Sequence, residues 1–246
     1  MTSTRVAILA AGCGSRLAPL TDDRPKCLID IGRTSPLGLM LQALDRPGTV
    51  DEILLVVGHA RAQVESFLAE RPVRVPIRLI FNPRYDTANN IYSAHLLRER
   101  CGDGFLLLNS DVVCDPDILE AALADEQSFL VVDPTRPPRP EAMKVRFLDG
   151  RLHAIDKPLD PTLADGEYVG IARFDARAAE AFFRATTAIL AEGGSDAWYE
   201  AAIERAAREV RFGLRSTAMK PWIEIDDHAD LERARREILP RLGKKA

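Results

Sequence analysis

Long apolar runs are absent from this 246-residue sequence, and their absence excludes a helical membrane protein. No run approaches the roughly 18 consecutive apolar residues that a membrane-spanning helix needs. The N-terminus passes directly into an apolar strand pattern, so we expect no signal peptide and no membrane insertion. A soluble cytoplasmic protein is the simplest prediction.

Basic residues are not in excess, and cysteine and histidine are scarce. The formal net charge is −4, whereas a nucleic-acid-binding surface needs a basic stripe, so we expect no nucleic-acid partner. The cysteines form no C-x-x-C pair, which indicates neither a zinc site nor a disulfide framework. The histidines lack metal-ligand spacing and are interpreted as structural: His59, His95, His153 and His228.

Two well-known phosphate-binding motifs are also missing. The sequence has no G-x-x-x-x-G-K-[ST], and Gly12-x-Gly14-x-Arg16 lacks the third glycine of the dinucleotide fingerprint. The same stretch nevertheless has a phosphate-binding character of its own. Four apolar residues, Val6–Leu9, predict a buried strand, and two alanines and two glycines follow it. Backbone N–H groups at that strand end are free to approach a phosphate chain closely.

Two cations complete this stretch. Arg16 carries a planar guanidinium that suits phosphate oxygens, and Lys26 carries a mobile point charge. Pro19 and Pro25 stiffen the segment that leads to Lys26. A chance glycine turn beside surface charges is the alternative, but it explains neither Arg16 nor Lys26. We therefore predict that Gly12 and Gly14 cradle a phosphate chain, aided by both cations.

Strand and helix patterns alternate along the first half of the chain. Helices are expected at 36–44, around 64–68, at 90–100 and from Asp115-Pro116 to 123, and strands at 6–9, 53–57, 77–81 and 105–108. Such alternation predicts an α/β fold with an open, mostly parallel central sheet. Ligands bind beyond the carboxyl ends of such strands, where Gly12, Asn82 and Asp111 are expected.

The second half of the chain has a different pattern, which predicts a β-insertion on the substrate side. Asp149-Gly150 between two apolar runs is a strong hairpin signal, and the proline-rich segment 134–140 predicts a loop or lid. Strands are expected at 129–132, 143–147, 152–155, 168–174 and 222–225, and helices at 176–190, 196–209 and from about 229. We predict one domain, 1–246, with a nucleotide-binding half of about 1–133 and an acceptor-binding, metal-completing half of about 134–246.

Acidic residues follow two predicted strands. Asp111 ends the apolar run 105–108, and a carboxylate there suits Mg²⁺, which uses one or two protein carboxylates plus substrate phosphates. Alternation in Trp222-Ile223-Glu224-Ile225-Asp226 puts Glu224 and Asp226 on one strand face. Asp227 is a candidate cap for the last helix, and from the residues alone a helix cap remains the alternative for Asp226 as well.

Asparagines are concentrated between residues 82 and 93. Their amides donate to and accept from a base edge at once, and Ser93 can join them. From the residues alone, a plain loop with asparagine caps is the favoured explanation.

These motifs together resemble a known family. L-A-A-G-x-G-x-R-x-x-P-L-T…P-K resembles the signature of nucleotidyltransferases. With N-x-x-Y…N-N-x-Y-S and E-I-D-D, the chain is similar over nearly its whole length to small cytidylyltransferases that act on phosphocholine or 2-aminoethylphosphonate. The resemblance implies a Rossmann-like nucleotidyltransferase sandwich that transfers CMP from CTP and releases pyrophosphate.

The resemblance also implies site residues. Arg16 and Lys26 are expected to be catalytic, and Asp111 and Asp226 to hold a Mg²⁺ cofactor. The nucleotide-binding residues are expected to be Leu9, Ala10, Ala11, Gly12, Gly14, Ser15, Arg16, Asn82, Asn89, Asn90 and Ser93. The acceptor-binding residues are expected to be Glu141, Lys144, Lys157, Tyr199, Glu200 and Glu224, with Trp198 and Asp196 as further pocket candidates. Ordinary hairpin lysines remain the alternative for Lys144 and Lys157, and the buried side of a helix for 198–200.

The expected partners are CTP and a small phosphonate or phosphate monoester, with 2-aminoethylphosphonate preferred over phosphocholine. A sugar-1-phosphate nucleotidyltransferase that uses UTP, dTTP or GTP is the alternative enzyme. A catalytically silent nucleotide sensor is the alternative of another class. The sequence leaves a homodimer open.

Overall fold

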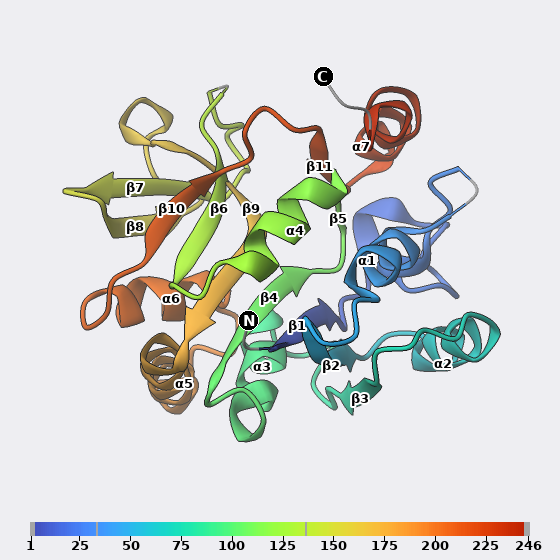
Figure 1. The fold of residues 1–246 in the computed structure, drawn as a ribbon, viewed down its shortest axis with the longest axis horizontal. Helices are drawn as coiled ribbons and strands as arrows, with labels where there is room; N and C mark the ends of the chain where they lie inside the picture. The colour runs from blue at the N-terminus through green and yellow to red at the C-terminus, as the bar shows by residue number, and fades with distance from the viewer. Residues whose placement is uncertain (1–2, 33, 136, 244–246) are drawn as a thin grey trace. The chain divides into compact units, whose positions relative to one another are not determined.

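The computed structural model describes residues 3–32, 34–135 and 137–243, drawn in colour in Figure 1. These residues form two compact units. Unit 1 comprises Met1–Asp86, Leu108–Ala124 and Lys220–Ala246, and unit 2 comprises Thr87–Leu107 and Asp125–Met219. Each unit therefore combines segments from before and after residue 133, and the predicted single domain stays a prediction. Arg136, in the predicted proline-rich lid, lies outside the described residues.

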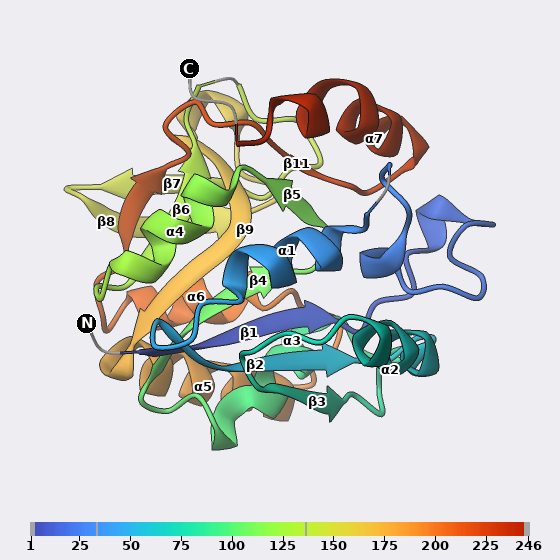
Figure 2. The same cartoon turned by 45° about the vertical axis from the view of Figure 1, so that its right-hand side comes forward.

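Unit 1 contains a parallel sheet. Strands β1 (Thr4–Ala10), β2 (Val50–Val57) and β3 (Ile77–Phe81) pair in that order, all parallel, and lie side by side in Figure 2. Buried parallel strands are continuous apolar runs, which is why these three could be read from the sequence. Helices α1 (Pro36–Leu44) and α2 (Arg61–Glu70) connect them. The predicted α/β class with a parallel sheet is confirmed.

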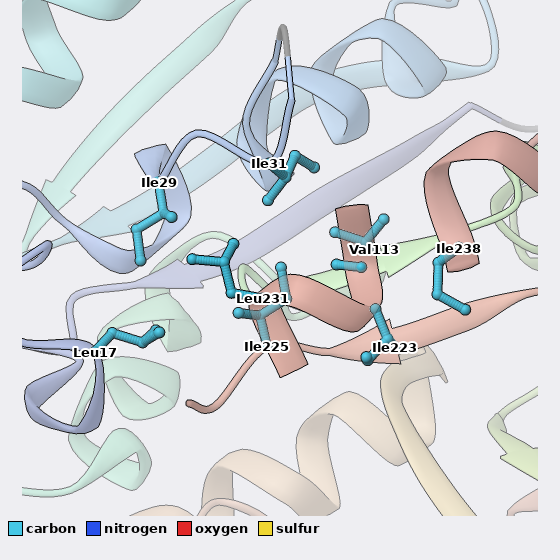
Figure 3. Packing of buried hydrophobic residues seen from close by; sticks show 9 residues of the cluster. Leu17, Ile29, Ile31, Val113, Ile223, Ile225, Leu231 and Ile238 are labelled. Carbon is cyan, nitrogen blue, oxygen red and sulfur yellow. The ribbon is translucent and has the colours of Figure 1, made fainter. Parts of the chain in front are cut away.

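A second, antiparallel pair of strands in unit 1 joins distant segments. Strand β5 (Val112–Cys114) pairs with β11 (Trp222–Glu224), and helices α4 (Pro116–Ala124) and α7 (His228–Arg233) follow the two strands. After α7 the chain continues through a π-helical turn, Ala234–Ile238, and a 3-10 turn, Leu239–Arg241. The motif L-A-A-G-x-G-x-R-x-x-P-L-T…P-K, residues 9–26, is called the signature segment below. Aliphatic side chains from the segments just described, from the signature segment and from the residues directly after it form one buried cluster, shown in Figure 3: Leu17, Ile29, Ile31, Val113, Ile223, Ile225, Leu231, Ala234 and Ile238.

Unit 2 contains mainly antiparallel strands, labelled in Figure 1. Strand β9 (Gly166–Asp175) pairs with β6 (Phe129–Asp133) and β7 (Lys144–Leu148), and β7 forms the predicted hairpin with β8 (Arg151–Asp156). Strand β10 (Gly213–Ser216), which the sequence did not predict, pairs in parallel with β6. Strand β4 (Gly104–Asn109) begins in unit 2, and Leu108 is its first residue in unit 1.

The helices of unit 2 are α3 (Asn90–His95), α5 (Ala176–Ala191) and α6 (Glu200–Ala207). The first is shorter than the predicted helix 90–100, because the chain tightens into a 3-10 turn at Leu96–Glu99. The sequence pattern also predicted that α6 begins at 196, but it begins at Glu200. Across the described residues, no helix has the length and apolar character needed to cross a membrane. The cytoplasmic location stays a prediction.

Candidate active site

The signature segment turns sharply after β1. Gly14 has φ +64°, a left-handed conformation that favours glycine. A Cβ atom at Gly14 would lie 3.1 Å from Cβ of Lys26 and 3.2 Å from Cγ2 of Thr21. A side chain there would therefore push away the segment that carries Lys26. At Gly12, by contrast, a Cβ atom would meet nothing within 4 Å, so space lies open beside the strand end.

Backbone hydrogen bonds bring two acidic segments to this turn. The N–H of Ser110 donates to the carbonyl of Leu9, 3.2 Å away, which places Asp111 beside the end of β1. The N–H of Ile225 donates to the carbonyl of Asp111, 3.1 Å away, and Glu224 lies opposite Val112 in the β5–β11 pair. Asp226 is the next residue after Ile225, so this hydrogen bond brings Asp226 close to Asp111. These are the two predicted metal ligands.

Lys26 lies at the centre of this arrangement. Its Nζ is 2.7 Å from Oδ2 of Asp111 and 2.7 Å from Oδ1 of Asp226. Nη2 of Arg16 is 3.0 Å from the other oxygen of Asp226. The Lys26 side chain is only 15% exposed. Two cations and two anions, all four predicted from the sequence, are therefore joined in one ion-pair cluster.

The charges of the cluster shift the pKa values of its members. Burial by itself would lower the pKa of Lys26, but the Asp111 and Asp226 carboxylates outweigh burial and raise that pKa. Burial would raise the pKa of Asp226, but Lys26 and Arg16 outweigh it and hold that pKa below its usual range. Both residues are consequently charged at neutral pH.

Three carboxylates in this place suit a divalent cation. Asp111, Glu224 and Asp226 each offer an oxygen, and these oxygens lie within 4.8 Å of one another. Oδ1 of Asp111 is buried and has no hydrogen-bond partner among the described residues, so it is an available ligand atom. Hard carboxylate oxygens are the ligands that Mg²⁺ prefers. Glu224 lies with the carboxylates of Asp111 and Asp226, and its predicted contact with the acceptor stays a prediction.

The two asparagines at the start of α3 hold another segment of unit 2. Oδ1 of Asn89 caps the helix by accepting from the N–H of Asn90 at 2.7 Å, and Nδ2 of Asn89 donates to the carbonyl of Asp196 at 3.0 Å. Oδ1 of Asn90 accepts from the N–H of Tyr199 at 2.8 Å. These bonds fix residues 195–199 in a non-helical path, which explains the late start of α6. The predicted contact of Asn89 and Asn90 with a base stays a prediction.

Asn82 and Ser93, the other polar residues of that motif, are buried. Oδ1 of Asn82 accepts from the N–H of Arg84 at 2.8 Å, in unit 1, while Ser93 belongs to α3 of unit 2. Their predicted role in nucleotide binding also stays a prediction.

Three predicted acceptor residues are used inside unit 2. Nζ of Lys144 donates to the carbonyls of Pro140, Ala142 and Lys157 at 2.7, 3.1 and 2.5 Å, which engages all three of its protons. Tyr199 is fully buried and its hydroxyl is 2.9 Å from that of Tyr168, while Glu200 is also buried. These contacts fit the structural alternative for Lys144, Tyr199 and Glu200, and their predicted role in acceptor binding stays a prediction.

The remaining acceptor candidates lie on the surface of unit 2. Trp198 is 41% exposed, and Nζ of Lys157 lies 4.2 Å from the centroid of its ring, a cation–π contact. Glu141 is exposed, and its Oε1 is 3.7 Å from Nη1 of Arg139. These side chains offer an aromatic face, an ammonium and a carboxylate.

Comparison with known proteins identifies the family. The family model described as nucleotidyl transferase matches residues 5–139, which is more than half of the chain. The chain belongs to the nucleotidyl transferase family. The match includes the signature segment, Lys26 and Asp111.

Two curated relatives are similar to parts of this nucleotidyl transferase. It is 37% identical over 138 residues to the CMP-5'-(3-aminopropyl)phosphonate synthase of Streptomyces rubellomurinus, covering 56% of this chain and 22% of that protein. It is 31% identical over 103 residues to the choline-phosphate cytidylyltransferase of Streptococcus pneumoniae, covering 42% of this chain and 43% of that protein. The chain thus spans less than half the length of either relative.

A solved structure is similar over the whole fold. The CTP:phosphocholine cytidylyltransferase of Streptococcus pneumoniae matches with a TM-score of 0.74 and 22% identity, covering 95% of this chain and 98% of that one. The predicted nucleotidyltransferase fold is confirmed.

Proposed function

We propose that this nucleotidyl transferase moves CMP from CTP to a small phosphonate or phosphate monoester. The observation that carries the proposal is Lys26, held by Asp111 and Asp226 beside the glycine turn. Both relatives described above have names of enzymes that make CMP derivatives of phosphonate or phosphate monoesters, which supports CTP as the donor.

The reaction needs no protein nucleophile. An acceptor oxygen attacks the α-phosphorus of CTP, and a new P–O bond forms. The bond from that phosphorus to the oxygen bridging to the β-phosphate breaks, and pyrophosphate leaves with the electron pair. Catalysis of such a transfer rests on positioning the reactants and neutralising their charge.

The residues of unit 1 have the chemistry for both tasks. The backbone at Gly12 and Gly14 approaches the triphosphate closely, and Arg16 binds its β- and γ-phosphates. Lys26, whose ammonium is fixed by two carboxylates, stabilises the charge that develops at the α-phosphate. Asp111 and Asp226, with Glu224 as a third oxygen donor, would hold Mg²⁺. When bound, Mg²⁺ neutralises phosphate charge.

The acceptor proposed is 2-aminoethylphosphonate rather than phosphocholine. A quaternary ammonium prefers several open aromatic faces, whereas a primary ammonium prefers carboxylates that accept its hydrogen bonds. In unit 2 one face of Trp198 is already in contact with the ammonium of Lys157, while the carboxylate of Glu141 is exposed. The relative named for an aminopropylphosphonate product points the same way.

The test begins with binding and ends with a product. Thermal shift with CTP, UTP, dTTP, GTP and ATP, each with Mg²⁺, identifies the nucleotide, because a ligand that binds the native state raises its apparent stability. Pyrophosphate release and product mass are then measured with 2-aminoethylphosphonate and phosphocholine in competition, and with sugar 1-phosphates separately.

Each outcome has a distinct meaning. A higher kcat/KM for 2-aminoethylphosphonate supports the proposal, and a higher value for phosphocholine overturns the choice of acceptor. Activity only with a sugar 1-phosphate overturns the cytidylyltransferase assignment. Nucleotide binding without pyrophosphate release under any condition identifies a sensor.

A further inference from the structure

Two histidines from distant elements bind the backbone of the signature loop, Ala18–Arg24. Nε2 of His59 is 2.8 Å from the carbonyl oxygen of Thr21, and Nε2 of His228 is 3.0 Å from the carbonyl oxygen of Ala18. A carbonyl oxygen only accepts, so each Nε2 carries a hydrogen. Most of this loop is exposed, and exposed carbonyls are ordinarily satisfied by water. Thr21 is buried and the other residues of the loop are exposed, so the two ring contacts add a restraint to a loop that is packed at one residue.

The position of His59 is fixed by its neighbour. A Cβ atom at Gly58 would lie 2.7 Å from the carbonyl oxygen of Ala11 and would also meet Tyr85. Only glycine lets the end of β2 come this close to the signature segment. The N–H of His59 then donates to the same Ala11 oxygen at 3.1 Å. The ring is thereby held beside Thr21.

The position of His228 is fixed by the start of α7. Asp227 caps this helix, with its Oδ1 accepting from the N–H of Asp230 at 2.9 Å. His228 is the first helical residue and is exposed. Its ring bond to Ala18 therefore joins the acidic segment 226–228 to the signature loop, next to the ion pair of Arg16 with Asp226.

The loop held in this way connects the two cations of the site. It runs from the 3-10 turn Ser15–Leu17, which carries Arg16, to the 3-10 turn Lys26–Leu28. Inside it, Oγ1 of Thr21 donates to the carbonyl of Gly14 at 2.9 Å. Bonds at Ala18 and Thr21 thus restrain the loop on both sides of Pro19-Leu20, close to the backbone that faces a phosphate chain.

We propose that His59 and His228 are positioning residues that hold the signature loop in the conformation that binds a nucleoside triphosphate. Their ring N–H groups bind carbonyls of the loop, so they act through the loop. They remove in advance part of the free-energy cost of ordering the loop when the nucleotide binds. The kinetic part of this inference rests on the proposed function, whereas its structural part does not.

The structural test uses the ligand-free protein. His59→Leu and His228→Leu remove the ring donor, while His59→Gln and His228→Gln keep an N–H donor of similar reach. Amide hydrogen exchange across residues 15–24 is expected to rise about fivefold in each leucine variant, the effect of losing one ordinary hydrogen bond, and to stay near wild type in each glutamine variant. His153→Leu, at an exposed position of strand β8 in unit 2, is the matched control and leaves this exchange unchanged.

Two exchange results overturn the proposal. One is unchanged exchange in both leucine variants. The other is an equal increase in the leucine and glutamine variants, which would show that ring packing rather than the hydrogen bond matters. Thermal unfolding is measured for every variant, and if His59→Leu does not fold, His228→Leu provides the same test at an exposed position.

The kinetic test separates binding from chemistry. Because Lys26 keeps its own two ion pairs, loosening the loop weakens ground state and transition state equally. KM for CTP should therefore rise about fivefold in the leucine variants with kcat nearly unchanged, and glutamine should restore it. A fall in kcat at constant KM contradicts the inference. A wild-type protein without turnover defeats the proposed function, and the exchange result then still decides the structural part.

Discussion

The ammonium of Lys26 lies 2.7 Å from a carboxylate of Asp226, a residue two hundred positions further along the chain. The same ammonium is 2.7 Å from Asp111, so one cation joins the signature segment to two remote strand ends. Ion pairs therefore hold the separate segments of unit 1 together, in addition to the buried aliphatic cluster.

The carboxylates should be essential for turnover. Asp111→Asn and Asp226→Asn preserve shape and remove one negative charge each. Pyrophosphate release should fall on the order of 10²-fold or more in both, because a cation-binding and Lys26-fixing charge is lost. Asp117→Asn is the matched control, since Asp117 is exposed and its carboxylate pairs with Lys220 at 2.6 Å. Near wild-type rates in Asp226→Asn would shift the role to Glu224.

Lys26 should matter for chemistry more than for binding. Lys26→Ala removes the fixed charge proposed to face the α-phosphate, so kcat should fall by on the order of 10²–10³ with a smaller change in CTP affinity. Steady-state kinetics and calorimetric CTP binding measure the two effects. Lys220→Ala, which removes a half-buried lysine of unit 1, is the control. A rise in KM alone would make Lys26 a ground-state binding residue.

Stability should depend on pH through Asp226. Its lowered pKa means that the unfolded chain takes up a proton at higher pH than the folded one. The carboxylate therefore stabilises the fold fully above the ordinary aspartate pKa of about 3.9, and this contribution is lost as pH falls through the lower folded value. Lys26 has the opposite sign: its raised pKa gives stability below about pH 10.4 that is lost as pH rises further.

Urea unfolding of wild type and Asp226→Asn across this range measures the Asp226 contribution. The difference in free energy of unfolding should be constant between about pH 5 and pH 9 and should shrink below about pH 4. A difference that persists unchanged to about pH 3 would contradict the assigned pKa direction.

Asn90 should contribute to stability through Tyr199. Asn90→Ala leaves the N–H of Tyr199 without its acceptor, which should lower the free energy of unfolding by about 1–3 kcal/mol. Asn90→Asp keeps the accepting oxygen and should lose less. Chemical denaturation measures both. Unchanged stability together with a raised KM for CTP would instead support the predicted contact with a base.

The long strands and helices could be predicted because their signals are local. The apolar runs at 6–9, 53–57 and 77–81 became β1, β2 and β3, and Asp149-Gly150 became the β7–β8 turn. Strands β5 and β10 were missed because each has only three or four residues and exists through a partner far along the chain. Pairing of that kind leaves no periodic pattern in the sequence.

The site residues likewise differ in whether a local sequence signal predicts them. Arg16, Lys26 and Asp111 could be predicted from residue chemistry beside a glycine turn, whereas Asp226 needed the family resemblance. The internal hydrogen bonds of Lys144 could not be predicted, because its partners are backbone carbonyls, which every residue has.

The bonds of Asn89 and Asn90 have a consequence for the order of folding. Each joins α3 to a segment more than a hundred residues later, with separations of 107 and 109 positions. Closing so long a loop costs chain entropy, which only the folding of the intervening β6–β9 strands and α5 can offset. The path of residues 195–199, including Trp198, is therefore expected to form late. Substitutions at either asparagine should then accelerate unfolding while leaving the folding rate nearly unchanged.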